Sequence, residues 1–219
     1  VVTFNIGGYT SIDSNNSQTF TNDANGTVSV TDGSQFIYAD TFYGSYSSLY
    51  SIKFINKGII NVFGNNSIFL EYANYTGDGS VNVADNGLAE FGAASIVGDF
   101  SIKSGGVLRF VTPESSQSPQ QVQGNVTFLD NTGTLQFIQN HETAALSSSY
   151  NPSALAIHGF RPGDTIILDG DDEVYTSSDM KWHVSWDYSP SDGVLTLSDK
   201  TGATPRILAT LTFVGMEKA

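Results

Sequence analysis

The chain has 219 residues, of which 22 are Asp or Glu and 9 are Lys or Arg, so its formal net charge at pH 7 is -13. A basic face for phosphate groups is therefore not expected, which argues against nucleic acid and anionic membrane surfaces as partners. The absence of cysteine excludes disulfides, thiolate metal sites and thiol nucleophiles, and no apolar run approaches the roughly 20 residues that a membrane-spanning helix needs.

The first predicted element is a strand over residues 1–6. Its residues Val2, Phe4 and Ile6 are apolar, it carries no charge, and two glycines follow it. Such a strand suits addition to the sheet edge of a neighbouring copy, and we predict self-association through it. The alternative is that it covers the first part of its own chain. Because the first residue is not methionine, we interpret the chain as a processed or trimmed product.

Short bursts of alternating apolar and polar residues fill the middle of the chain, and no segment keeps a helical period. Three segments share one template, in which a short strand, a polar turn with glycine and a second strand ending in Phe follow one another. These segments are residues 79–91, 98–110 and 124–137. The equivalent turn positions are Gly87, Gly106 and Gly133, and we expect positive φ at the first two.

Weaker copies of the template lie at residues 25–30, 56–63 and 192–197. Counted from Gly58, the turn glycines recur at intervals near the range of about 20 to 50 residues that is typical of repeat architectures. Stacked repeats would bury their apolar residues in one column. The sequence therefore predicts an all-β fold, a β-solenoid (β-helix); an antiparallel sandwich with chance likeness between strands is the alternative.

The solenoid register predicts which side chains are buried. Residues two and four positions after each turn glycine should point into the core, and their neighbours should point outward. Expected in the buried stack are Val81, Val83, Phe91, Leu108, Phe110, Leu135 and Phe137. Expected on the outside are Asn82, Glu90 and Arg109.

The character of the sequence changes after the third copy, where residues 141–152 are polar and irregular. Further on, residues 182–188 alternate apolar and other residues before a Pro-Ser-Asp-Gly turn into Leu195 and Leu197, a pattern typical of a β-hairpin. A solenoid needs a cap over its exposed end. We therefore predict solenoid coils over residues 1–140, and a C-terminal β section over residues 141–219 that packs as an antiparallel cap.

The glycine-punctuated repeats resemble passenger regions of bacterial autotransporter-like adhesins. The tail resembles the segment that leads up to Hint-type self-processing domains in alphaproteobacterial surface proteins. The matching pieces of the tail are residues 159–168, 184–187, 193–197 and 208–215. No Hint domain follows, and no cysteine is present to start its chemistry. The resemblance implies an exported passenger, located extracellularly or at the cell surface, with no catalytic residues of its own.

An acidic cluster follows the tail's first strand, where Asp169, Asp171 and Asp172 surround a glycine. Oxygen-rich loops of this kind bind calcium in some proteins. The spacing does not match an EF-hand, so the favoured interpretation is a solvated acidic turn, with calcium as the alternative and no other cofactor expected.

Two pairs of residues have the chemistry of an acid and a base, His141 with Glu142 and His183 with Asp187. Neither pair has a partner that the spacing fixes, and no motif supplies a nucleophile. We therefore predict no catalytic residues and no enzyme activity.

The aromatic residues Trp182, Trp186 and Tyr188 lie at alternate positions and share one strand face. An exposed aromatic platform of this kind stacks on sugar rings. Burial beneath the end of the fold is the favoured alternative.

Together these patterns predict an exported structural or adhesive surface protein, a building block of an extracellular filament or matrix. Its expected partners are copies of itself, and beyond them extracellular polysaccharide or a host surface. The alternatives are a carbohydrate-binding module that uses the aromatic platform, and a polysaccharide-active β-helix enzyme that uses carboxylates in a surface groove.

Overall fold

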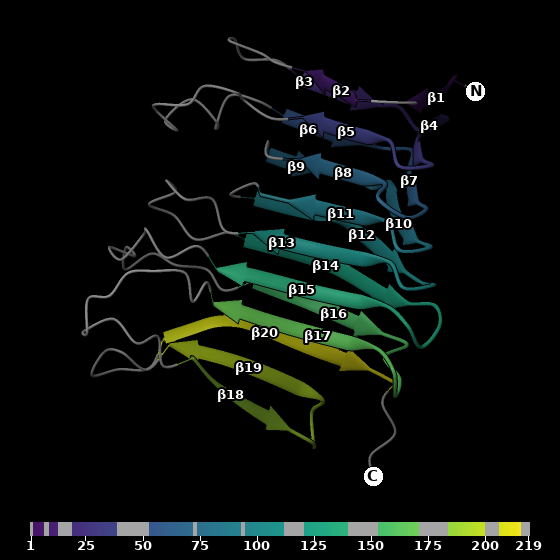
Figure 1. The fold of residues 1–219 in the computed structure, drawn as a ribbon. Coiled ribbons are helices and arrows are strands. Elements are labelled where there is room, and N and C mark those ends of the chain that lie inside the picture. Colours follow the sequence, from purple (N-terminus) through teal and green to yellow (C-terminus); the bar gives the residue numbers. More distant parts are fainter. Residues whose placement is uncertain are drawn as a thin grey trace, which may run out of the picture.

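The computed structural model describes residues 2–6, 9–12, 19–38, 53–71, 74–92, 95–111, 121–139, 153–170, 184–199 and 206–215. In this part of the chain the protein is all-β, as predicted, and contains no helix. None of the described residues therefore belongs to a helix that could cross a membrane. The strands form two sheets (Figure 1), and both contribute side chains to one apolar core.

The larger sheet, sheet A, contains 13 strands. In order of pairing, its main path is β1 (Val2–Ile6), β4 (Gly26–Thr31), β7 (Ile59–Phe63), β10 (Ser80–Ala84), β12 (Ser95–Ile102), β14 (Gln121–Phe128), β16 (Ser153–His158), β20 (Arg206–Val214), β19 (Val194–Asp199) and β18 (Val184–Ser189). A side branch pairs with β12 and consists of β3 (Thr19–Asn22), β6 (Lys53–Asn56) and β9 (Asn74–Thr76).

The smaller sheet, sheet B, contains seven strands. In order of pairing they are β17 (Thr165–Gly170), β15 (Thr134–Gln139), β13 (Val107–Val111), β11 (Leu88–Phe91), β8 (Ile68–Glu71), β5 (Gln35–Tyr38) and β2 (Tyr9–Ile12). All of these pairings are parallel.

The chain alternates between the two sheets. After each strand of the main path of sheet A up to β16, a short turn leads into a strand of sheet B, and the chain then returns to sheet A. Up to β16, each new strand of the main path pairs in parallel with the previous strand of that path, so these strands add in chain order from β1 at one end (Figure 1). Neighbouring strands are therefore far apart in sequence but equivalent in position.

The register of these pairings confirms the repeat template. In sheet A, Ser80 lies opposite Asp99 and Gly98 lies opposite Gly124, which aligns the starts of the three copies. In sheet B, Phe91, Phe110 and Phe137 lie side by side. The residues two positions before them are aligned in the same way: Ala89, Leu108 and Leu135.

The predicted alignment of the turn glycines is wrong at Gly58. Gly58 precedes Ile59, which pairs with Ser80, so Gly58 aligns with the start of the next copy and not with Gly87. The residue at the position of Gly87 is Ser67, because Ile68 pairs with Leu88. Gly58 was misplaced because a glycine is present at both turns of the later copies, and the spacing alone does not distinguish them.

The expectation of positive φ at Gly87 and Gly106 is also wrong. The left-handed positions in these turns lie one or two residues earlier, at Asp85, Asn86, Ser104 and Gly105. Glycine is required instead by a close approach of the backbone. A Cβ atom at Gly87 would lie 2.7 Å from the carbonyl oxygen of Val62.

The core is a continuous column between the sheets. Val81, Val83, Phe91, Leu108, Phe110 and Leu135 are buried as predicted. Phe137 is partly buried and packs against this column. Rings from both sheets meet inside it: the centroids of Phe91 and Phe100 are 5.4 Å apart, and those of Phe54 and Phe69 are 5.8 Å apart.

Asn82 and Arg109 are partly exposed, but the expectation that Glu90 faces solvent is wrong, because it is only 9% exposed. Alternation places its side chain on the outer face of β11. There the guanidinium group of Arg109, from the next strand, donates to it and covers it.

A polar ladder crosses the interior where β3 and β6 end. Asn22 and Asn56 are both buried, and the side-chain amide of Asn22 donates to the side-chain oxygen of Asn56 over 2.8 Å. The amide of Asn56 donates in turn to the Tyr75 hydroxyl over 2.9 Å. Further bonds to the carbonyl oxygens of Ile59 and Ser80 fix the bend between neighbouring segments of sheet A.

The C-terminal hairpin is present as predicted. β18 and β19 pair antiparallel, and β19 pairs antiparallel with β20. Residues 192–197, predicted as a weak repeat copy, are therefore part of the hairpin and not of the parallel stack. β16 and β17 still pair in parallel, so the change of pairing comes after Gly170. The domain division at residue 140 stays a prediction.

Candidate functional site

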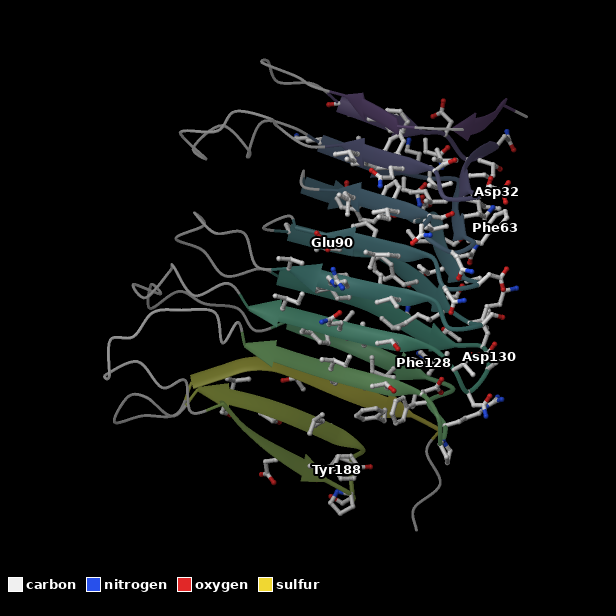
Figure 2. All side chains as sticks on the ribbon, viewed as in Figure 1. Asp32, Phe63, Glu90, Phe128, Asp130 and Tyr188 are labelled. Atoms are coloured by element: carbon white, nitrogen blue, oxygen red, sulfur yellow. The ribbon has the colours of Figure 1, made fainter. Side chains whose placement is uncertain are left out.

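The turns that lead from sheet A into sheet B are connected to one another by side chains. The Asn86 side-chain amide donates to the Asn65 side-chain oxygen over 2.9 Å, joining two successive turns. The Gly33 N–H donates to the Ser67 hydroxyl in the same manner. Figure 2 shows Asp32 and Asp130, which belong to two of these turns, on the same side of the molecule. This side is rich in carboxylates and amides.

Asp130 connects two turns through its carboxylate. One oxygen accepts from the Ser104 N–H over 2.8 Å, and the other accepts from the N–H and the hydroxyl of Thr132. The hydrogen bond from the Ser104 backbone is the main cause that holds the pKa of Asp130 below its ordinary value of 3.8, and those from Thr132 act in the same direction. The ionised form is thus the one that the folded turn favours.

Acid should weaken this connection. Because the pKa of Asp130 is lower in the folded chain than in the unfolded one, its carboxylate adds stability above the unfolded pKa and loses it as pH falls through the folded pKa. Asp130→Asn is therefore expected to reduce stability slightly at neutral pH and to match the parent in strong acid. Denaturant melts over a pH series check this, with Asp78→Asn, at an exposed position between strands, as the control. A difference that stays constant with pH would contradict it.

Asp164, next to the predicted acidic cluster, has a structural position. Its carboxylate accepts from the Gly133 N–H over 3.1 Å and from the Arg161 N–H over 2.9 Å. Oδ1 therefore holds the last parallel turn against the one before it, and Oδ2 closes the turn to which Asp164 itself belongs.

The outer face of sheet A carries rows of polar residues. Along one row, Asn82 donates to Asn61 over 2.9 Å and Ser101 donates to Asn82 over 2.7 Å. In the neighbouring row the Asn125 amide donates to Asp99 over 2.7 Å, and its oxygen lies 3.4 Å from His158 Nε2. These groups bond mainly to their equivalents on the next strand, which aligns the strands and leaves a regular polar surface.

The outer face of sheet B carries a charged row. Arg109 donates through Nη1 to Glu90 over 2.9 Å and through Nε to the Gln136 side-chain oxygen over 3.0 Å. One guanidinium thereby joins three adjacent strands.

Six of the candidate site residues lie outside the described residues. These are Asp171, Asp172, His141, Glu142, Trp182 and His183. Asp169 belongs to β17 and Trp186 to β18, but their side chains are not described. No cluster of three or more His, Cys, Asp or Glu side chains is found within the described part of the chain. The calcium and platform hypotheses stay predictions.

Tyr188 is the member of the predicted platform whose side chain is described. It is 37% exposed, and its ring makes an edge contact with Phe213 at a centroid distance of 6.3 Å. Burial, the favoured interpretation, is therefore wrong for this residue (Figure 2). Asp187, beside it on β18, is exposed.

The predicted self-association strand is β1, which pairs in parallel with β4 over Val2 to Ile6. It is the last strand of sheet A at this end, so its other edge has no partner among the described strands. β1 therefore covers β4 of its own chain, which is the alternative interpretation, and self-association through the other edge stays a prediction.

No protein-family model, no curated protein sequence and no solved structure matches the chain.

Proposed function

We propose that this chain is a β-solenoid that serves as an exported structural or adhesive protein, a building block of an extracellular assembly. One observation carries the proposal. Successive stretches of the chain add one strand each to two parallel sheets around a single core, and their equivalent residues lie in register. Such a stack grows in length with every repeat, and length with regular faces is what a fibre or a surface-displayed spacer needs.

The side chains support a structural task. Buried aromatic rings, the Asn22 and Asn56 ladder and the Asp130 connection all hold one strand or turn against the next. In the outer rows of sheet A, asparagine and serine side chains bond to one another in the same direction. These interactions stabilise the stack along its axis.

The free edge of β1 provides the contact for assembly. An edge strand presents unpaired N–H and C=O groups to any strand that approaches. At the other end of sheet A, the hairpin of β18 and β19 forms the edge. Both β1 and β18 are thus edges among the described strands, and we assign strand addition to β1 because its segment contains Val2, Phe4 and Ile6 and no charged residue, whereas β18 contains Asp187.

Deletion of residues 1–8 tests this contact. The parent is expected to increase in mass with concentration in light scattering, and the deletion variant is expected to grow less, because the apolar strand that makes the contact is removed and the edge of β4 takes its place. A thermal melt controls for folding. Particles of the deletion variant that grow as the parent does would rule out strand addition, and a parent that stays monomeric at every concentration would rule out self-association.

Carbohydrate binding is the second candidate function, and the exposed ring of Tyr188 favours it. A glycan array tests it, with Tyr188→Ala as the variant. Binding that is lost in the variant would support this function, whereas turnover of a polysaccharide in a substrate panel would favour the enzyme hypothesis.

A further inference from the structure

The outer face of sheet B is unusually apolar for a surface. The described outward positions alternate with buried core residues such as Phe69, Leu108 and Leu135. Most of them are partly exposed aliphatic side chains, and the most exposed is Ile167 at 37%. These aliphatic residues are Ile37, Ile68, Leu70, Leu88, Val107, Val111, Ile138 and Ile167.

The outer face of sheet A is different. Its rows consist mainly of Ser, Thr and Asn; its strongly exposed apolar residues are Ile59, Phe63, Val97, Ile207 and Val214, which are separated by these polar residues. The two sheets share one core and the same strand spacing, so the contrast lies in the outward residues alone. Singly exposed apolar residues are normal, but a contiguous apolar face indicates an interaction surface.

Charge favours a second copy of the chain as the partner at this face. The whole chain carries a net charge of -13, which opposes association between copies. Among the outward positions of sheet B whose side chains are described, however, the charged ones are Glu90 and Arg109, and these pair over 2.9 Å. The register adds Asp169, opposite Ile138, on the edge strand β17. Two copies meet less repulsion where the charges in the middle of the face are paired.

The area of the outer face of sheet B corresponds to a reversible contact between two copies. From β5 to β17 the strands cover about 25 Å at the usual strand spacing, and their lengths correspond to about 13 to 20 Å. Such a face buries roughly 500 Å² on each copy, or about 1,000 Å² in total, which is near the lower limit for a specific interface. Association should therefore depend on concentration.

We propose that sheet B is a homodimer interface, in which the outer faces of two copies pack against each other around a two-fold axis. The aliphatic rows form the apolar contact, as in the packing of two sheets in a sandwich. Glu90 and Arg109 lie near the middle of the face, so a two-fold places the carboxylate of each copy near the guanidinium of the other. A two-fold contact closes at two copies. It is distinct from the edge contact of β1.

A matched pair of substitutions tests the interface. Ile68→Glu places a charge on the apolar face of sheet B, and Ile59→Glu makes the same change on the outer face of sheet A. Both positions are the first residues of successive strands, β8 and β7. In sedimentation equilibrium with residues 1–8 deleted, the Ile59→Glu variant is expected to reach two copies, as does the deletion parent. The Ile68→Glu variant is expected to dissociate at least about tenfold more readily.

Cysteine substitutions provide a test that does not depend on the stability of Ile68→Glu. The chain contains no cysteine, so one introduced thiol reports only on its own surroundings. Under mild oxidation of the full chain, at least one of Ile68→Cys, Leu88→Cys and Val107→Cys is expected to form disulfide-linked pairs, and Ile59→Cys is not. A monomeric deletion parent, or equal crosslinking on the two sheets, would overturn the interface and leave the β1 contact untouched.

Discussion

Replacement of Phe110 by Ala is expected to lower the free energy of unfolding by about 3 to 5 kcal/mol, which is typical of a large cavity in a core. Phe110 is fully buried, and its ring lies between those of its equivalents on adjacent strands, with centroid distances of 6.0 Å to Phe91 and 5.6 Å to Phe137. It also meets Phe100 of sheet A at 5.5 Å. The cavity cannot close without movement of several strands.

Denaturant melts measure this loss, and Val97→Ala is a suitable control. Val97 is an apolar strand residue that is 39% exposed on the outer face of sheet A, so its truncation should cost less than about 1 kcal/mol. A similar small loss at Phe110 would show that the rings do not form a rigid column.

Gly124→Ala is expected to be one of the most harmful changes that add only one methyl group. Gly124 has a φ of 128°, a conformation that side chains with a Cβ rarely adopt, and its Cα lies opposite Gly98 in the neighbouring strand. A Cβ atom there would collide with the carbonyl oxygen of Gly98. Backbone strain costs about 1 to 3 kcal/mol, and the collision adds to it.

Substitutions at two other glycines separate the cost of backbone strain from the cost of the collision. Gly215 has a φ of 78° but open space around its Cβ position, so Gly215→Ala tests strain alone. Gly106 has no positive φ, but a Cβ atom there meets the carbonyl group of Val83, so Gly106→Ala tests crowding alone. In thermal melts Gly124→Ala should lower the melting temperature more than either Gly215→Ala or Gly106→Ala. If it costs no more than Gly215→Ala, the strands separate enough to relieve the contact.

The repeat alignment was predictable because side chains of adjacent parallel strands obey one register. Phe91, Phe110 and Phe137 could be aligned from sequence, since burial requires a large apolar residue at the same place in every copy. Glu90 was not predictable in the same way. Alternation assigns it to the outer face, but only the structure shows that Arg109, from another copy, covers it.

The interior asparagine ladder was not predicted, although the sequence contains a signal for it. Residues 20–22 and 54–56 both have the form Phe-x-Asn and are soon followed by glycine. Polar residues in a β-rich sequence are ordinarily assigned to the surface. The pairing of Phe20 with Phe54 and of Asn22 with Asn56 places the amides inside, where they bond to each other.

The hairpin shows that strand direction also could not be predicted from the repeat pattern. Residues 192–197 match the repeat template in composition, but strand direction is not encoded in alternation. The tight turn before Val194 determines it, because a short turn joins antiparallel strands.

The path of the chain has a consequence for how such a protein can change in evolution. Connections from sheet A to sheet B are short throughout, whereas those that return from sheet B vary, from the few residues between Phe91 and Ser95 to the long segment between Tyr38 and Lys53. The strands on either side stay in register despite these differences. Insertions and deletions in the connections from sheet B to sheet A are thus compatible with unchanged sheets. New peptide sequences can be inserted there without a change in the strands.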